Sequence, residues 1–213
     1  MDIKVSNYEI QSEKAKKELL KFDYEEIVEK LDLKHDDEYL YLKFIDGEYR
    51  LGKKTAEFER LEGENTYKNA GFNEVMSILD LFAYLSKLSK DQLKATKNFV
   101  APTGLKGVVN TGNIQTHSWV FSKHAKAFSG KTDKLEEACK KMGGTKINQG
   151  DVGYIIDIFD YIQVMFVYYE EDSDFEAEIK VLWTDNVLDF VHYETTYYML
   201  GRLFERMAEL IEE

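Results

Sequence analysis

Residues 152–169 read VGYIIDIFDYIQVMFVYY, and this stretch decides the fold. It is rich in β-branched and aromatic residues, and a turn is predicted near Asp160, so it contains two strands. The acidic segment Glu170–Asp174 interrupts the pattern, which resumes in Glu178–Trp183. Three strands joined by short connections predict an antiparallel meander.

A second β-rich region lies nearer the start of the chain. Apolar and polar residues alternate in Tyr39–Ile45, and Asp46-Gly47 separates this run from Glu48–Leu51. Asp-Gly tolerates the positive φ of a type I′ turn, so the pattern predicts a hairpin that turns at Asp46-Gly47. Alternation in residues 56–62 predicts a third strand.

Helical periodicity occupies most of the remaining chain. Predicted starts are an N-cap at Asp23 with Glu26 completing a capping box, and N-caps at Asn73, Ser118 and Thr132. The predicted helices cover 7–31, 73–85, 118–128 and 132–142. Strands do not alternate with helices, so the predicted fold class is α+β. We expect a single domain over residues 1–213, with a mainly antiparallel sheet, helices packed on it and a long C-terminal helix.

The C-terminal helix carries one apolar stripe. The residues on it are Tyr193, Thr196, Tyr197, Leu200, Leu203, Phe204, Met207, Leu210 and Ile211. Such a stripe faces a core. Leu203, Phe204 and Met207 lie at its centre and are predicted to be fully buried.

Composition limits the classes of function. The chain has 28 basic and 40 acidic residues, for a formal net charge of −12, which disfavours nucleic-acid binding. Its single cysteine, Cys139, excludes an intramolecular disulfide and four-cysteine metal sites. No apolar run approaches the ~20 residues that span a bilayer, and the N-terminus lacks a signal-peptide pattern. We expect a cytoplasmic protein that does not enter a membrane.

The segment Asp189–Tyr198, DFVHYETTYY, is followed by Leu203-Phe-Glu-Arg206. Together they resemble the C-terminal signature of a bacterial and archaeal family called domain of unknown function 3786. Further matching pieces are Ile78–Ser86, Leu105–Gly107, Gly150–Tyr154 and Phe175–Asp185, so the resemblance covers roughly residues 20–212. Family members occur mostly in anaerobes, and some resemble fusions to cysteine-rich iron–sulfur modules. This chain lacks those cysteines, so a redox role carried by such modules cannot be transferred to it. The resemblance implies one domain in a cytoplasmic setting and leaves the function open.

Polar residues crowd the start of the C-terminal helix. His192, Glu194 and Thr195 form a candidate ligand-binding or acid–base cluster, and Asp189 is a candidate N-cap. A capping network around a hydrogen-bonded histidine is the alternative. On a helix, His192 and Glu194 would point about 200° apart. We therefore expect His192 at or just before the helix start, partly buried and beside another polar side chain.

Two glycine-flanked loops supply further candidate ligand-binding residues. Lys106 precedes Gly107 within the predicted loop 98–113, and Asp151 follows Gly150. Backbone N–H groups of glycine loops bind anions, whereas the alternatives are a surface turn and a strand entry. Lys106 and Asp151 are the expected partners of His192.

Three hypotheses of function follow. The first is a small-ligand-binding or accessory domain. The second is an enzyme that transfers protons through His192 and Glu194, with Lys106 holding an anionic substrate. The third is a protein–protein adaptor with an exposed aromatic patch. The one histidine of this cluster is a thin basis for a metal site, so no metal ligands are assigned, and the sequence leaves the cofactor unknown. Convergence of the candidate residues on one concavity would favour the first two hypotheses.

Overall fold

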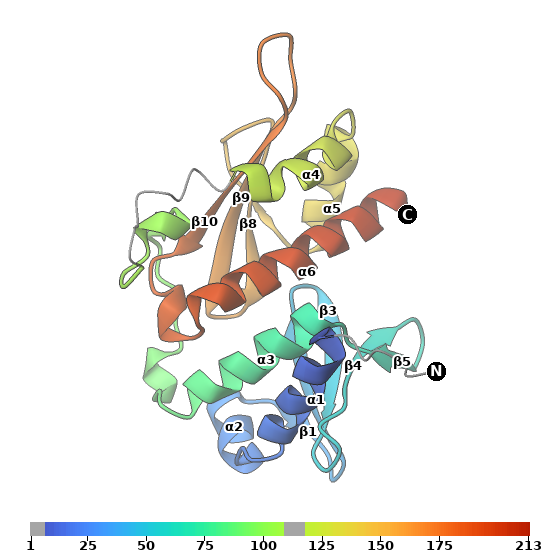
Figure 1. Ribbon diagram of the computed structural model, residues 1–213, viewed down its shortest axis with the longest axis vertical. Helices are drawn as coiled ribbons and strands as arrows, with labels where there is room; N and C mark the ends of the chain where they lie inside the picture. The colour runs from blue at the N-terminus through green and yellow to red at the C-terminus, as the bar shows by residue number, and fades with distance from the viewer. Residues whose placement is uncertain (1–6, 109–117) are drawn as a thin grey trace. The chain divides into compact units, whose positions relative to one another are not determined.

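The computed structural model describes residues 7–108 and 118–213, and side chains in 10–108 and 121–213. Its strands form two five-stranded antiparallel sheets (Figure 1). The chain divides into two compact units, Met1–Leu93 with Phe190–Leu200, and Lys94–Asp189 with Gly201–Glu213. The α+β class, the antiparallel pairing and the long C-terminal helix are thus confirmed, with two sheets in place of one. The single domain stays a prediction.

In its described residues, the first unit contains one sheet, three complete helices and the start of the C-terminal helix. The helices are α1 (Asn7–Leu19), α2 (Tyr24–Leu31) and α3 (Phe72–Leu85), followed by a 3-10 turn at Lys90–Gln92. The strands are β1 (Lys34–His35), β2 (Tyr39–Phe44), β3 (Gly47–Gly52), β4 (Phe58–Glu62) and β5 (Thr66–Asn69), which pair in sequence order. Helix α3 is the most apolar of the three, and Ile78, Leu81, Phe82 and Leu85 are fully buried.

The observed helix starts show which N-caps can be predicted from the local sequence. Asp23 caps α2 as predicted, because its Oδ1 accepts the N–H groups of Glu25 and Glu26. The Glu26 carboxylate pairs with Lys30 at 2.6 Å instead of completing the capping box. The N-cap of α3 is Gly71 and not Asn73. Glu74 at the third helical position accepts the Gly71 N–H, which moves the start two residues upstream.

The first hairpin forms as predicted, but it turns one residue earlier. Phe44 pairs with Gly47, so the two turn residues are Ile45 and Asp46, and Ile45 takes the positive φ of 57°. The Ile45 side chain is buried, and this burial outweighs the strain of a β-branched residue in that conformation. Gly47 belongs to the strand β3, where the ring of Tyr49 covers it.

Gly47→Val is expected to destabilise the protein by about 1–3 kcal/mol through overpacking and not through positive φ. A Cβ at position 47 would lie 2.8 Å from Tyr49 Cε2. That ring is fixed, because it stacks on Phe58 and its hydroxyl donates to Glu74 at 2.5 Å. Urea denaturation measures the change, and Glu48→Val, at an exposed neighbouring position, is the control. Equal stability of the two variants would contradict the proposed clash.

The second unit contains the meander. Its strands are β6 (Phe99–Val100), β7 (Thr145–Lys146), β8 (Val152–Phe159), β9 (Ile162–Tyr169) and β10 (Glu178–Thr184), in the order β6-β10-β9-β8-β7. The antiparallel meander is confirmed, with Asp160 in the β8–β9 turn. The predicted loop 98–113 contains β6 and a 3-10 turn at Pro102–Gly104, and residues 109–113 lie outside the described part of the chain. A further 3-10 turn covers Val187–Asp189.

Two helices accompany this sheet. Helix α4 (Ser118–Phe128) packs on β10, and α5 (Thr132–Lys141) packs on β8 (Figure 1). Thr132 is the first residue of α5 and not its N-cap, a position that Lys131 holds. The predicted cap at Ser118 falls where side chains are not described. Gly143, with a φ of 77°, follows the end of α5, where the sequence predicted a stop.

Helix α6 (Tyr193–Glu212) contributes residues to both units. In the second unit, Leu203, Phe204 and Met207 are buried, which confirms the predicted stripe. The Phe204 ring meets the rings of Phe121 and Phe166. Within the described residues, no helix is long and apolar enough to span a membrane.

Native Cys139 is expected to resist alkylation. It is buried on α5, and burial, with a smaller contribution from Glu136, raises the pKa of its thiol to about 12. The thiolate is the reactive form, so at pH 8 labelling should be about a thousandfold slower than for an exposed thiol. Iodoacetamide labelling followed by mass spectrometry measures the rate, with protein in 8 M urea as the control. Rapid labelling of the native protein would show that α5 opens readily.

Candidate functional site

A cluster of polar contacts at the start of α6 centres on Asp80 of α3. The Asp80 Oδ2 atom accepts the backbone N–H of His192 at 2.6 Å and the hydroxyl of Thr195 at 2.7 Å. Its Oδ1 lies 2.8 Å from His192 Nδ1. A carboxylate from another helix therefore caps α6, and it holds the imidazole at the same time.

The His192 side chain lies on the surface of this cluster. It is 71% exposed, and its ring packs edge-on against Tyr84, with 5.0 Å between the ring centres. An ionised carboxylate only accepts hydrogen bonds, so the contact with Asp80 places a proton on Nδ1. In the neutral ring, Nε2 then carries the lone pair, and Nε2 is the nitrogen that can act on a bound molecule.

These positions confirm the predicted place of His192 and correct two other predictions, the burial of His192 and the N-cap role of Asp189. The helix begins at Tyr193, directly after His192, as predicted. The expectation of a partly buried His192 was wrong, because 71% of its side chain is exposed. Asp189 is not the N-cap, since it lies in the preceding 3-10 turn and Asp80 already satisfies the first N–H.

Thr195 and Glu194 have different surroundings. Thr195 is buried, its hydroxyl donates to Asp80, and its N–H donates to the carbonyl of His192 at 3.1 Å. Glu194 is exposed and accepts the hydroxyl of Tyr198 at 2.9 Å. The structure therefore joins His192 and Thr195 through Asp80, whereas Glu194 lies on another side of the helix.

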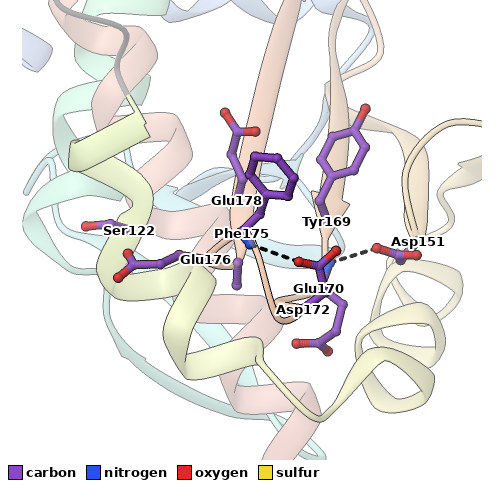
Figure 2. A pocket seen from close by; sticks show the side chains of 9 residues that line it. Ser122, Asp151, Tyr169, Glu170, Asp172, Phe175, Glu176 and Glu178 are labelled. Carbon is purple, nitrogen blue, oxygen red and sulfur yellow. Dashed lines mark hydrogen bonds between the residues drawn. The ribbon is translucent and has the colours of Figure 1, made fainter.

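Lys106 and Asp151 belong to the second unit. Lys106 is exposed, and its charge helps to hold the pKa of Asp185 below its usual value, after hydrogen bonds from Thr96 and Asn98. Asp151 Oδ2 accepts the N–H of Glu170 at 2.7 Å and lines a hollow beside the β9–β10 connection (Figure 2). Whether these two residues share a site with His192 stays a prediction.

The sequence analysis did not identify Asp80, because no local sequence pattern around it indicates its partner. It lies 112 residues before His192. One signal was present, however. In α3, FNEVMSILDLFAYL, the only charged residues are Glu74 and Asp80. A carboxylate in so apolar a helix indicates a specific partner, because a buried charge must be compensated.

The described residues contain no arrangement of side chains that could bind a metal ion. Over 7–108 and 118–213, no group of three or more His, Cys, Asp and Glu side chains could hold an ion. His192 has one carboxylate partner, and that carboxylate is already used by three donors.

Comparison with known proteins identifies the family. No curated protein and no solved structure matches this chain. The family model described as Domain of unknown function (DUF3786) matches residues 23–206. That match includes α3 with Asp80, the α6 entrance with His192 and Thr195, and the whole meander. The chain therefore belongs to the DUF3786 family.

Proposed function

We propose that this chain binds a small molecule at the start of α6 and that His192 exchanges a proton with it. The observation that carries the proposal is the contact between Asp80 Oδ1 and His192 Nδ1. This proposal joins the ligand-binding and proton-transfer hypotheses. It replaces Glu194 with Asp80 as the carboxylate that works with the histidine.

Capping alone does not require an imidazole at position 192. Asp80 caps α6 through a backbone N–H and the Thr195 hydroxyl, and any residue at 192 would supply that N–H. The exposed ring contributes little buried area, and it makes an edge-to-face contact with the Tyr84 ring. An imidazole held in one orientation and open to solvent is the arrangement of a general base.

The chemistry of the pair follows from the positions of its charges. When Nε2 takes up a proton, the ring becomes an imidazolium, which the Asp80 carboxylate stabilises while it keeps the ring in place. The N-terminus of a long helix also favours negative charge within its first turn. Both effects support a small anionic ligand, or one whose negative charge increases as its proton leaves.

His192→Asn provides the sharpest test. The Asn amide can reproduce the Nδ1–H donor toward Asp80, but it has nothing at the position of Nε2. His192→Gln does the reverse, and His35→Asn, on an exposed histidine of the same unit, is the matched control. The probe is a panel of small carboxylic and phosphoric acids. NMR spectra report binding through the ring signals of His192 in the wild type and through the backbone amide signals of residues 193–195 in every variant.

We expect at least one acid to shift the His192 ring signals and to bind the His192→Asn variant at least tenfold more weakly, with unchanged melting temperature. The His35→Asn variant should bind as the wild type does. A panel without any ligand, or ligands that bind His192→Asn normally, would contradict the proposal.

We further propose that the protein works in the cytoplasm and does not bind nucleic acid. A reduced, buried Cys139 suits a reducing compartment. The net charge of −12 repels a phosphate backbone. Retardation of a DNA or RNA probe at physiological salt would contradict the second statement.

A further inference from the structure

The second unit contains a hollow whose lining differs in chemical character from the cluster around His192. Its volume is about 660 Å³, and the residues that line it are Ser122, Asp151, Tyr169, Glu170, Asp172, Phe175, Glu176, Ala177 and Glu178 (Figure 2). Five of these side chains are carboxylates, and no Lys or Arg is among these lining residues. Such a volume admits a few side chains of a ligand.

Three of the carboxylates, Asp151, Glu170 and Asp172, accept hydrogen bonds that shape the hollow. Glu170 accepts the Ser129 hydroxyl at 2.6 Å and the Gly130 N–H at 2.9 Å. Asp172 accepts the N–H groups of Asp174 and Phe175, which hold the pKa of its carboxyl below the usual value. These bonds give the β9–β10 connection a defined shape, so the hollow is formed before any ligand arrives.

Phe175 is the feature that folding does not explain. Its side chain is 74% exposed, the highest value among the large apolar residues that are exposed in the described chain. Tyr169 is also exposed, and it pairs across the strands with Glu178. Both aromatic side chains line the hollow, and aromatic residues are enriched at protein interfaces relative to the rest of the surface.

Two lysines of this chain already lie beside residues that line the hollow, and they show which chemical group fits there. Lys180 Nζ lies 4.6 Å from the centre of the Tyr169 ring and 3.4 Å from Glu178. Lys126 Nζ lies 3.7 Å from Glu176. An alkylammonium group thus already sits between an aromatic face and a carboxylate, which is the geometry of a cation–π contact.

We propose that this hollow docks a basic segment of a partner protein. The segment would place a lysine ammonium on Tyr169 and Glu178, displacing Lys180, and an apolar side chain against Phe175. A second copy of this chain is a poor occupant, because two proteins of net charge −12 repel each other. A small free cation would make no apolar contact with Phe175. The carboxylates and the exposed Phe175 ring together therefore favour a peptide that carries both basic and apolar side chains.

The test measures fluorescence anisotropy with a labelled heptapeptide of alternating lysine and leucine. A lysine–serine heptapeptide tests the apolar requirement, and spermine, as a competitor, tests the polyamine alternative. The variants are Phe175→Ser and the double change Glu176→Gln with Glu178→Gln. The control is Glu137→Gln with Asp160→Asn, which alters the net charge equally at exposed sites away from the hollow.

We expect Phe175→Ser to weaken the lysine–leucine peptide about tenfold, as the loss of one buried aromatic contact implies. It should leave the lysine–serine peptide unchanged. The double Glu variant should weaken both peptides about fivefold at low salt, and the control less than twofold. Lys180→Met should strengthen binding, because it frees Tyr169 and Glu178.

Other outcomes would overturn the proposal. If the double Glu variant and its charge-matched control bind the peptides equally, the attraction comes from the net charge of the protein and not from the hollow. Spermine binding that depends on Glu178 but not on Phe175, together with weak peptide binding, would assign the hollow to polyamines. Sedimentation that shows a dimer dependent on Phe175 would assign it to a second copy. Failure of the His192 test would affect none of these results, since the two sites share no residue.

Discussion

Leu203→Ala is expected to lower the free energy of unfolding by about 2–5 kcal/mol. Leu203 has no exposed surface, and it lies on the α6 stripe between Leu200 and Met207, which are also buried. Alanine would replace a side chain of four carbons with a single methyl group and leave a cavity among rigid neighbours. The large aromatic ring of Phe204 is itself held by Phe121 and Phe166, so the site cannot collapse easily.

Two measurements check this result. Urea denaturation gives the free energy directly, and native-state alkylation of Cys139 should accelerate about 30-fold or more, because Cys139 lies in the same unit. Glu205→Ala, at an exposed position of the same helix, is the control and should change stability by less than about 0.5 kcal/mol. An unchanged transition in Leu203→Ala would mean that the apolar stripe does not face a core.

The same experiment addresses the number of domains. Since α6 contributes residues to both units, we propose that the chain unfolds as one domain. Trp183 fluorescence reports on the second unit, and circular dichroism reports on the whole chain. Coincident transitions would support one domain, whereas separate transitions, of which Leu203→Ala shifts one, would indicate two.

Asp80→Ala is expected to cost roughly 2–4 kcal/mol, which combines the loss of a helix cap with a buried hydroxyl left without its acceptor. The Asp80 carboxylate is largely buried, and it serves three donors from the α6 entrance. Thr195 is buried, so its hydroxyl has no ready access to water. The stability effect should therefore exceed that of an ordinary surface cap.

His192→Ala separates the contribution of the helix cap to stability from that of the imidazole contact. It keeps the backbone N–H that Asp80 accepts and removes only an exposed ring, so we expect a loss below about 1 kcal/mol. Asp37→Ala, at an exposed position of the same unit, is the control for loss of a carboxylate. If Asp80→Ala and His192→Ala destabilise equally, the imidazole contact and not the cap holds the helix start.

Local patterns in the sequence predicted what depends on local chemistry. The 152–183 meander and the 39–52 hairpin follow from β-branched, aromatic and alternating residues. The Asp23 cap follows from a side chain two and three residues from the N–H groups that donate to it. The hairpin turn shifted to Ile45 and Asp46 because the buried Ile45 and the Tyr49 ring over Gly47 decide the register. Neither effect is visible in the Asp-Gly dipeptide alone.

The candidate site was predictable only in part for a similar reason. His192 and Thr195 were found because they stand at a recognisable helix start. Asp80 acts on them from a different helix, and a hydrogen bond between residues 112 positions apart leaves no local pattern. The exposure of Phe175 also depends on how the β9–β10 connection is tied by Glu170 and Asp172, which composition does not reveal.

The lengths of the outer strands bear on how this aromatic-rich chain avoids aggregation. β1, β6 and β7 are two residues long, and each lies at the edge of its sheet. The outer strand β5 is four residues long and largely exposed, with Lys68 within it. Short or charged edges offer few free backbone groups for another chain to pair with. The long apolar strands β8, β9 and β10 are thus kept inside the sheet, and loss of β7 or β6 would expose the segments most able to form fibres.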